Sequence, residues 1–303
     1  MSLLSAFLLG LIQGVAEFLP ISSSGHLAIA QNLFHLSIEG VDDVFFSILL
    51  HLGTLFAVFV AYWSDIKEMV VEFFCGIRDV VRHQTPTPVP PARRLILMIV
   101  VGTLPLFAVL PVQNFVESLN SNTYFIGAAL LVTGVLLFTC DRVRKGKKTA
   151  KTATMLDALL VGVGQAIATV PGISRSGMTI CAGCFRGFER KFAVRFAFLL
   201  SIPAVLGANI LEISDVIAAG GIDTALLPIY AVGVLTAAVS GYLSIALVRL
   251  VANKGKFGAF AYYCWAAGAV TLVLTALLRA GEAHVHRVCM QYPKSIYIAN
   301  KRC

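Results

Sequence analysis

Long apolar stretches separated by short polar segments dominate this chain. A membrane-spanning helix needs about 20 mostly apolar residues. Stretches that satisfy this length lie near 44–63, 94–111 (with its apolar flanks), 123–140, 192–210, 227–249 and 258–279. The pattern predicts an all-α polytopic membrane protein with six transmembrane helices in one membrane domain.

Two further apolar stretches, 2–34 and 155–187, are interrupted halfway by polar turns. The turns read Pro-Ile-Ser-Ser-Ser-Gly at 20–25 and Pro-Gly-Ile-Ser-Arg-Ser-Gly at 171–177. Each stretch is predicted to form two short helices joined by its turn. Irregular backbone at membrane depth is tolerated only where protein or a cavity covers it. We therefore expect two re-entrant helical hairpins.

Basic residues divide the polar segments into two groups. Lys and Arg gather in 67–94, 142–151, 186–195 and 249–256, whereas 1–43, 112–122 and 211–226 contain neither. The loops rich in Lys and Arg are cytoplasmic in membrane proteins. The six spans alternate correctly only if the first hairpin hangs from the external face and the second from the cytoplasmic face.

The two hairpins also match in sequence when the register is shifted by 152 residues. Seven of the sixteen positions from 10 to 25 are then identical. The matches include Gln13 with Gln165 and the Ser-x-Ser-Gly of both turns. Each half, 1–141 and 142–279, would be one hairpin plus three spans, and an odd number of spans inverts the second copy. Such inverted repeats place their broken helices near the bilayer midplane.

Smaller features complete the predicted layout. Residues 64–83 are expected to form an interfacial amphipathic helix. Thr154 and Asp157 have the spacing of a helix-capping box at the start of the second hairpin. The polar tail 280–303 is expected to be poorly ordered.

Composition agrees with the membrane class. Hydrophobic residues make up 58% of the 303 residues and charged residues only 13%, and the mean hydropathy is +0.84. A soluble domain is nearer half apolar and a quarter charged. The net charge of +8 lies in short loops between apolar runs, which is typical of membrane topology and argues against a nucleic-acid partner.

Two charged residues fall far from the predicted membrane boundaries. Glu17 lies within the first hairpin, and Arg175 lies in the turn of the second. A charge at membrane depth is costly and usually marks a functional site. A purely structural ion pair between these two residues is the alternative.

The polar turns contain the side chains of a phosphate site. Their serines could simply cap the helices that follow, but capping requires neither His26 nor Arg175. Two helix N-termini that meet near the midplane would favour an anion. An arginine suits phosphate oxygens, and a serine with a nearby imidazole can form a nucleophile and its base. The candidate residues from the first hairpin are Gln13, Glu17, Ser22, Ser23, Ser24, Gly25 and His26, and from the second Gln165, Ser174, Arg175, Ser176 and Gly177.

The motifs of the two hairpins, taken together, resemble those of one known family. Gln13-x-x-x-Glu17, the turn from Pro20 to His26, and the turn 171–177 together closely resemble the signature segments of the bacterial undecaprenyl-diphosphate phosphatases, a family linked to bacitracin resistance. The resemblance covers roughly residues 1–279. It implies interlocked inverted repeats in the bacterial cytoplasmic (inner) membrane, with a site open to the outer, periplasmic face. The implied reaction removes the terminal phosphate of undecaprenyl diphosphate and recycles this lipid carrier for cell-wall synthesis.

The resemblance also implies individual roles. Ser23 matches the nucleophile, His26 the acid/base, Arg175 the phosphate-binding arginine and Glu17 an essential carboxylate. We predict that the other candidate residues bind substrate. Glu17 has two roles open to it: it could hold a Mg²⁺ or Ca²⁺ that bridges the diphosphate, or orient His26 or Arg175. No organic cofactor is expected, and Gln13, at a position the family fills with either Glu or Gln, argues against a strong metal site.

A transporter or lipid flippase is the competing interpretation, because inverted repeats with broken helices suit transport at least as well as catalysis. Ser23 together with His26 favours the enzyme, since a pure carrier needs neither. A non-catalytic membrane subunit would leave Glu17 and Arg175 unexplained. The sequence leaves the oligomeric state open, with a homodimer among the candidates.

Overall fold

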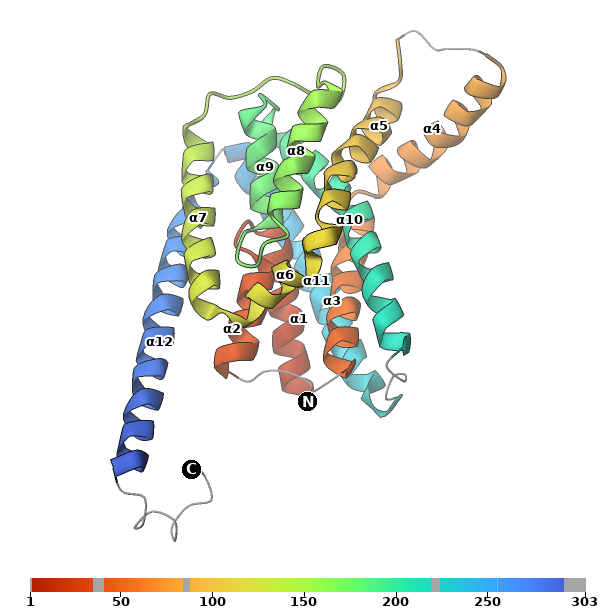
Figure 1. Ribbon diagram of the computed structural model, residues 1–303. Coiled ribbons are helices and arrows are strands. Elements are labelled where there is room, and N and C mark those ends of the chain that lie inside the picture. Colours follow the sequence, from red (N-terminus) through yellow and green to blue (C-terminus); the bar gives the residue numbers. More distant parts are fainter. Residues whose placement is uncertain (1, 35–40, 84–87, 219–223, 255, 292–303) are drawn as a thin grey trace.

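The computed structural model describes residues 2–34, 41–83, 88–218, 224–254 and 256–291. Within these ranges the chain forms helices and no β-strand, and the helices assemble into the bundle of Figure 1. Six helical segments are long and apolar enough to span a membrane: Val44–Ala61, Pro91–Ser121, Thr123–Arg142, Arg190–Ile213, Leu227–Lys254 and Gly258–Ala280. The prediction of an all-α polytopic membrane protein with six spans is confirmed.

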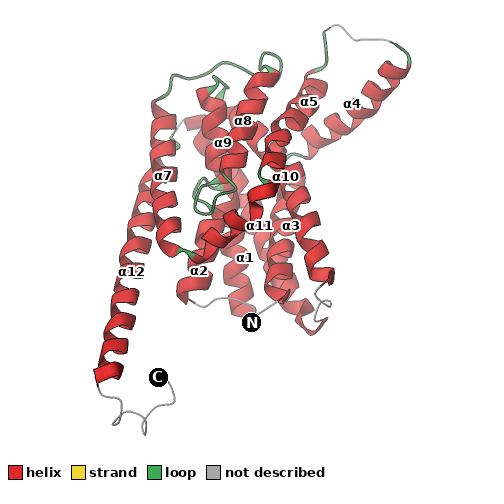
Figure 2. Cartoon of the chain, in the orientation of Figure 1, coloured by secondary structure: helices red, strands yellow, loops and turns green. Residues whose placement is uncertain are grey.

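Both interrupted stretches form two short helices joined by an irregular turn. The first consists of α1 (Leu3–Phe18) and α2 (Ser23–Phe34), and the second of α8 (Met155–Ile167) and α9 (Arg175–Phe185). In Figure 2 a loop, drawn in green, lies inside the bundle close to α8 and α9. Whether the hairpins open from opposite faces of a membrane, as inverted repeats, stays a prediction.

Side-chain caps explain where several of these short helices begin. Ser22 Oγ accepts a hydrogen bond from the amide of Gly25 at 3.3 Å, and Ser174 Oγ accepts one from Gly177 at 3.1 Å. Each cap satisfies one of the amides that have no partner inside the first helical turn. At the start of α8, Thr154 and Asp157 form the predicted capping box.

Four further helices lie close to predicted ones: α3 (Val41–Ala61), α4 (Trp63–Val81), α7 (Thr123–Arg142) and α11 (Leu227–Lys254). Helix α10 (Arg190–Ala218) continues eight residues beyond the predicted end at 210, and the short helix α6 (Gln113–Ser118) was not predicted. The span predicted at 94–111 is less regular. It begins as α5 (Pro91–Thr103) and continues as 3-10 turns from Leu104. Pro105 explains this break, because its ring removes an amide hydrogen and crowds the preceding helical turn.

The last helix, α12 (Gly258–Gln291), is longer than predicted. The predicted span ends at 279, and poor order was expected beyond it. The structure continues the helix through Gln291, and poor order of this tail stays a prediction. The rest of the predicted tail, 292–303, lies outside the described residues.

Helix α4 confirms the helix predicted at 64–83 and leans away from the bundle together with the start of α5 (Figure 1). Arg93 joins the two, because its Nη2 donates to Asp79 at 2.9 Å and to Glu72 at 3.1 Å. The hydrogen bond from Arg93 lowers the pKa of the Asp79 carboxyl. Helix α4 also carries exposed apolar side chains, including Val70, Val71 and Phe74.

Glycines allow α1 to pack tightly against α11. A Cβ atom on Gly14 would lie 2.0 Å from Ser240 Oγ and 2.5 Å from the carbonyl oxygen of Ala237. On the same face of α1, a Cβ on Gly10 would lie 2.5 Å from the carbonyl oxygen of Gly233. Small residues permit such close backbone approach between membrane helices. The contact fixes the helix that carries Gln13 and Glu17.

We therefore expect Gly14→Val to destabilise the folded protein by about 1–3 kcal/mol, because the larger side chain must push α1 away from α11. The measurement is the thermal unfolding midpoint in detergent. Gly207→Val is the matched control, since a Cβ on Gly207 meets no atom within 4 Å. Equal midpoints for the two variants would contradict this packing.

Candidate active site

The two polar turns touch each other in the interior of the bundle. A Cβ on Gly25 would lie 3.1 Å from the Cα of Gly172, and one on Gly177 would lie 3.3 Å from the Cβ of Pro20. A direct hydrogen bond also joins the hairpins, because Ser176 Oγ donates to the carbonyl oxygen of Leu19 at 3.2 Å. The structure therefore brings together the turns that the sequence predicted to meet.

Spans behind the turns hold them in place. Thr133 on α7 donates from Oγ1 to the carbonyl oxygen of Gly172 at 3.1 Å and accepts from the amide of Ser174 at 3.2 Å. Gly172 has a φ of 87°, a conformation that glycine adopts without the strain a side chain would add. On the other side, Cys264 of α12 packs its thiol 3.7 Å from the carbonyl oxygen of Pro20.

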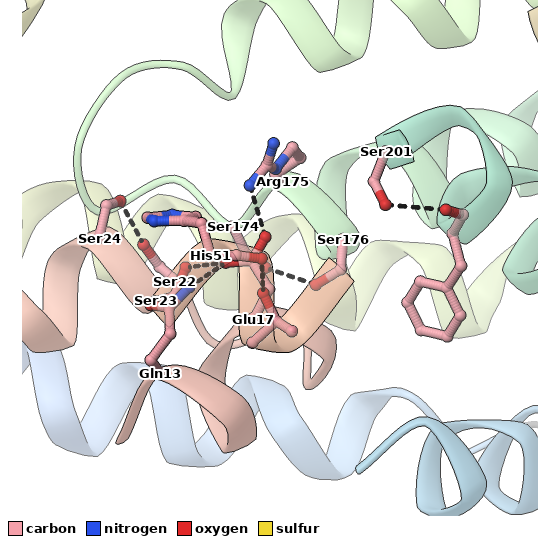
Figure 3. A network of polar contacts seen from close by, with 12 residues as sticks. Gln13, Glu17, Ser22, Ser23, Ser24, His51, Ser174, Arg175, Ser176 and Ser201 are labelled. Atoms are coloured by element: carbon pink, nitrogen blue, oxygen red, sulfur yellow. Dashed lines mark hydrogen bonds and ion pairs between the residues drawn. The ribbon is translucent and has the colours of Figure 1, made fainter. Parts of the chain in front are cut away.

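Glu17 is the centre of the polar cluster (Figure 3). One carboxylate oxygen accepts from Arg175 Nη2 at 2.5 Å. The other accepts from Ser23 Oγ at 2.7 Å and from Gln13 Nε2 at 3.2 Å. The side chain of Glu17 is only 6% exposed, and that of Arg175 is 26% exposed. A carboxylate from one hairpin thus binds both the arginine of the other hairpin and the predicted nucleophile.

Ser22, the residue before Ser23, has a strained backbone conformation. Ser22 is buried and has a φ of 73°, a left-handed conformation that residues with a side chain rarely adopt. Such strain is maintained only where the surrounding contacts over-determine it, and it clusters at functional sites. Ser22 Oγ also lies 3.4 Å from Ser24 Oγ, as Ser174 Oγ lies 3.2 Å from Ser176 Oγ in the second turn.

Free backbone amides add to this site. At the start of α2, the amides of Ser23 and Ser24 have no hydrogen-bond partner in the described chain. The same holds for the amides of Arg175 and Ser176 at the start of α9. Helix N-termini with free amides attract anions. Both helices therefore begin beside the Glu17–Arg175 pair with donors available for phosphoryl oxygens.

His26 is oriented differently from the sequence-based expectation. Its Nδ1 lies 2.7 Å from the carbonyl oxygen of Ser22, and its Nε2 lies 2.8 Å from the hydroxyl of Tyr263 on α12. Because a carbonyl can only accept, Nδ1 carries the hydrogen. No hydrogen bond joins His26 to Ser23 among the described residues; the serine donates to Glu17 instead. The acid/base role of His26 stays a prediction.

The two predicted glutamines have unequal environments. Gln13 contacts Glu17 through its Nε2, while its Oε1 is buried without a partner. Gln165 is completely buried, and neither polar atom of its amide has a partner in the described structure. Buried amides normally find a partner, ordered water included. A role for Gln165 in substrate binding stays a prediction.

His51 was missed in the sequence reasoning. It lies on α3, close enough to Glu17 for their charges to interact, and Figure 3 shows it among Glu17, Ser23 and Ser174. A signal for it was present, because it is the one histidine inside the apolar span predicted at 44–63. Ionisable residues inside membrane spans usually mark functional sites.

The cluster does not fit a metal ion held by protein ligands. Glu17 is its single carboxylate, and three donors already occupy that carboxylate. No group of three or more His, Cys, Asp or Glu side chains in the described ranges could hold a metal. Mg²⁺ and Ca²⁺ prefer several oxygen ligands. The described residues therefore provide a carboxylate paired with arginine rather than a cation cage, and a Mg²⁺ or Ca²⁺ bound mainly by substrate oxygens stays a prediction.

The side of the cluster that faces α10 is closed. Glu17, Arg175, Ser176, Thr179 and Ser201 border a cavity there of about 10 Å³, which has room for roughly one water. A diphosphate cannot enter a space of this size. The opposite side is more open, because Ser24 is exposed and Ser23 is partly exposed.

Together these features define a multi-pass membrane protein in which two helix N-termini meet beside a buried Glu17–Arg175 ion pair. A family model described as "Bacitracin resistance protein BacA" matches residues 6–270. The chain belongs to this family. It is 41% identical to an undecaprenyl-diphosphatase of Alkaliphilus metalliredigens over 91% of this chain and 100% of the relative. A Methanosphaera stadtmanae protein of the same name is 38% identical over 92% of this chain and 100% of the relative.

The ion pair makes a specific prediction about stability. Arg175→Met leaves Glu17 buried without its charge partner and should destabilise the protein by about 3 kcal/mol. Adding Glu17→Gln removes the orphaned charge, so the double variant should recover most of the lost stability, with the thermal unfolding midpoint in detergent as the measurement. A double variant as unstable as the sum of the single losses would contradict a direct pair.

Proposed function

We propose that this protein hydrolyses undecaprenyl diphosphate to undecaprenyl phosphate and inorganic phosphate. Relatives with 36–41% identity over about 90% of the chain are named undecaprenyl-diphosphatases, which supports this activity. The observation that carries the proposal is the hydrogen bond from Ser23 Oγ to Glu17, whose other oxygen is paired with Arg175. This arrangement combines a nucleophile, a proton acceptor and a phosphate-binding cation in one cluster.

In the first step, Ser23 Oγ attacks the terminal phosphorus. The Oγ–P bond forms, the bond from phosphorus to the bridging oxygen breaks, and undecaprenyl phosphate leaves. The serine proton passes to Glu17, which already accepts the serine hydroxyl at 2.7 Å. A positioned base of this kind typically contributes 10²–10⁴-fold to the rate.

Arg175 links substrate binding to the basicity of Glu17. Only its Nη2 is hydrogen-bonded to the carboxylate, so the rest of the guanidinium remains free to bind phosphoryl oxygens. As the negative phosphate approaches, it competes for the arginine charge. The negative charge of Glu17 is then balanced less by Arg175, so the carboxylate accepts the serine proton more readily. The free amides of α2 and α9 stabilise the charge on the transferring group.

In the second step, water attacks the phosphoserine. The new O–P bond forms, the Ser23 Oγ–P bond breaks, and the proton held by Glu17 returns to Oγ as the attacking water gives up its own proton. His26 is the candidate base for this water, a role that requires its Nε2 to exchange the hydroxyl of Tyr263 for the water. Direct attack by water on the diphosphate, with Ser23 only binding phosphate, is the variant mechanism.

The cellular setting follows the same proposal. The enzyme lies in the cytoplasmic membrane, and its site faces outward. The absence of Lys and Arg from the segment around the first hairpin, and their abundance in the segment 142–151, support this orientation. The reaction returns the lipid carrier to cell-wall synthesis and protects against bacitracin. A homodimer stays a prediction, which a mass measurement in detergent would test.

Ser23→Ala should lower the rate of phosphate release by at least about 10³-fold, because the nucleophile is lost. The assay follows inorganic phosphate from undecaprenyl diphosphate in detergent, and unchanged elution on size exclusion checks the fold. Ser64→Ala, at an exposed serine of α4, is the matched control and should keep its activity. Full activity of Ser23→Ala would exclude both the phosphoserine and the phosphate-binding roles of this serine.

A further inference from the structure

His51 lies at membrane depth on α3. It follows Val44 by seven residues and precedes Ala61 by ten within one apolar span, so it is about 10 Å along the helix from its nearer end. The neighbouring turn of α3 is tightly packed against α11, because a Cβ on Gly53 would lie 2.7 Å from the carbonyl oxygen of Val234. The backbone that carries His51 is therefore held rigidly.

The imidazole is oriented by its own helix. Nδ1 of His51 lies 2.9 Å from the carbonyl oxygen of Ser47. A carbonyl oxygen only accepts, so this contact places the ring hydrogen on Nδ1 and turns Nε2 outward from the helix. In the described structure Nε2 has no hydrogen-bond partner, and the side chain is only half-buried.

The free Nε2 belongs to a ring beside the catalytic cluster. In Figure 3 the side chain of His51 is grouped with those of Glu17 and Ser23. The unbonded Nε2 of His51 is not buried, so a bound ligand can reach it. His26 has both nitrogens occupied by Ser22 and Tyr263, so the two imidazoles differ in availability.

We propose that His51 is a diphosphate-binding residue whose Nε2 makes a hydrogen bond to a phosphoryl oxygen of the bound substrate. Nε2 can accept from a protonated phosphoryl oxygen or, as imidazolium, donate to a charged one. Arg175 and the amides of the two turns would hold the phosphate from the hairpins, while His51 holds it from α3. This inference rests on the proposed function.

The test compares His51→Leu with His51→Gln for release of phosphate from undecaprenyl diphosphate. Leucine removes the hydrogen bond, so KM should rise about tenfold, while kcat should stay within about threefold of wild type. Glutamine can donate or accept and should remain within about threefold of wild type in both. The inhibition constant of inorganic pyrophosphate should rise in His51→Leu as KM does.

Controls separate this inference from the proposed function. His83→Gln, at an exposed histidine after α4, should behave as wild type. If His51→Leu fails to fold, His51→Asn replaces it, because its amide is too short to reach and should raise KM relative to His51→Gln. An unchanged KM in folded His51→Leu or His51→Asn, or a fall in kcat alone, overturns the role of His51. Absence of phosphate release by wild type would instead overturn the proposed function.

Discussion

The ion pair between Glu17 and Arg175 is the interaction on which the rest of the site depends. It joins residues that are 158 positions apart, one from each hairpin. Neither charge is stable alone at this depth, because an unpaired charge inside a membrane protein is costly. The pair therefore requires the two turns to meet, and it leaves the second carboxylate oxygen of Glu17 free to bind Ser23. The contact that joins the two hairpins is also the one on which the proposed chemistry depends.

Several structural features serve this meeting of the turns. The glycines at 25 and 177 let the two turns approach, since a Cβ there would crowd the opposite turn, and Gly172 lets its turn approach α7, where a Cβ would lie 2.7 Å from the Cβ of Ala129. Ser22 and Ser174 satisfy the amides of Gly25 and Gly177 and so define where α2 and α9 begin. The sequence left open whether these serines cap helices or belong to the site, and the structure shows both positions. Ser22 and Ser174 cap, while Ser23 and Arg175 occupy the equivalent position that faces Glu17.

Much of this arrangement could be predicted from the sequence because membrane constraints are strong. Span lengths, basic loops and polar turns inside apolar stretches led to the six spans and the short helix pairs, and the two charges at membrane depth indicated their contact. Contacts set by side-chain direction could not be predicted. The hydrogen bond of His26 with Tyr263 depends on how α12 packs, and the proximity of His51 to Glu17 depends on the rotation of α3. The helical extension to Gln291 was missed because hydropathy does not measure helix propensity.

In the proposed mechanism the serine proton passes to Glu17 and the phosphoryl group to Ser23. The most direct test is rapid quenching of a single turnover with undecaprenyl diphosphate labelled in its terminal phosphate, followed by peptide analysis of the denatured protein. We expect transient label on the peptide that contains Ser23, formed no later than inorganic phosphate appears. In Glu17→Gln, formation of this label should slow by at least about 10²-fold. Label that passes directly into inorganic phosphate, with none on the protein at any time, would contradict this mechanism.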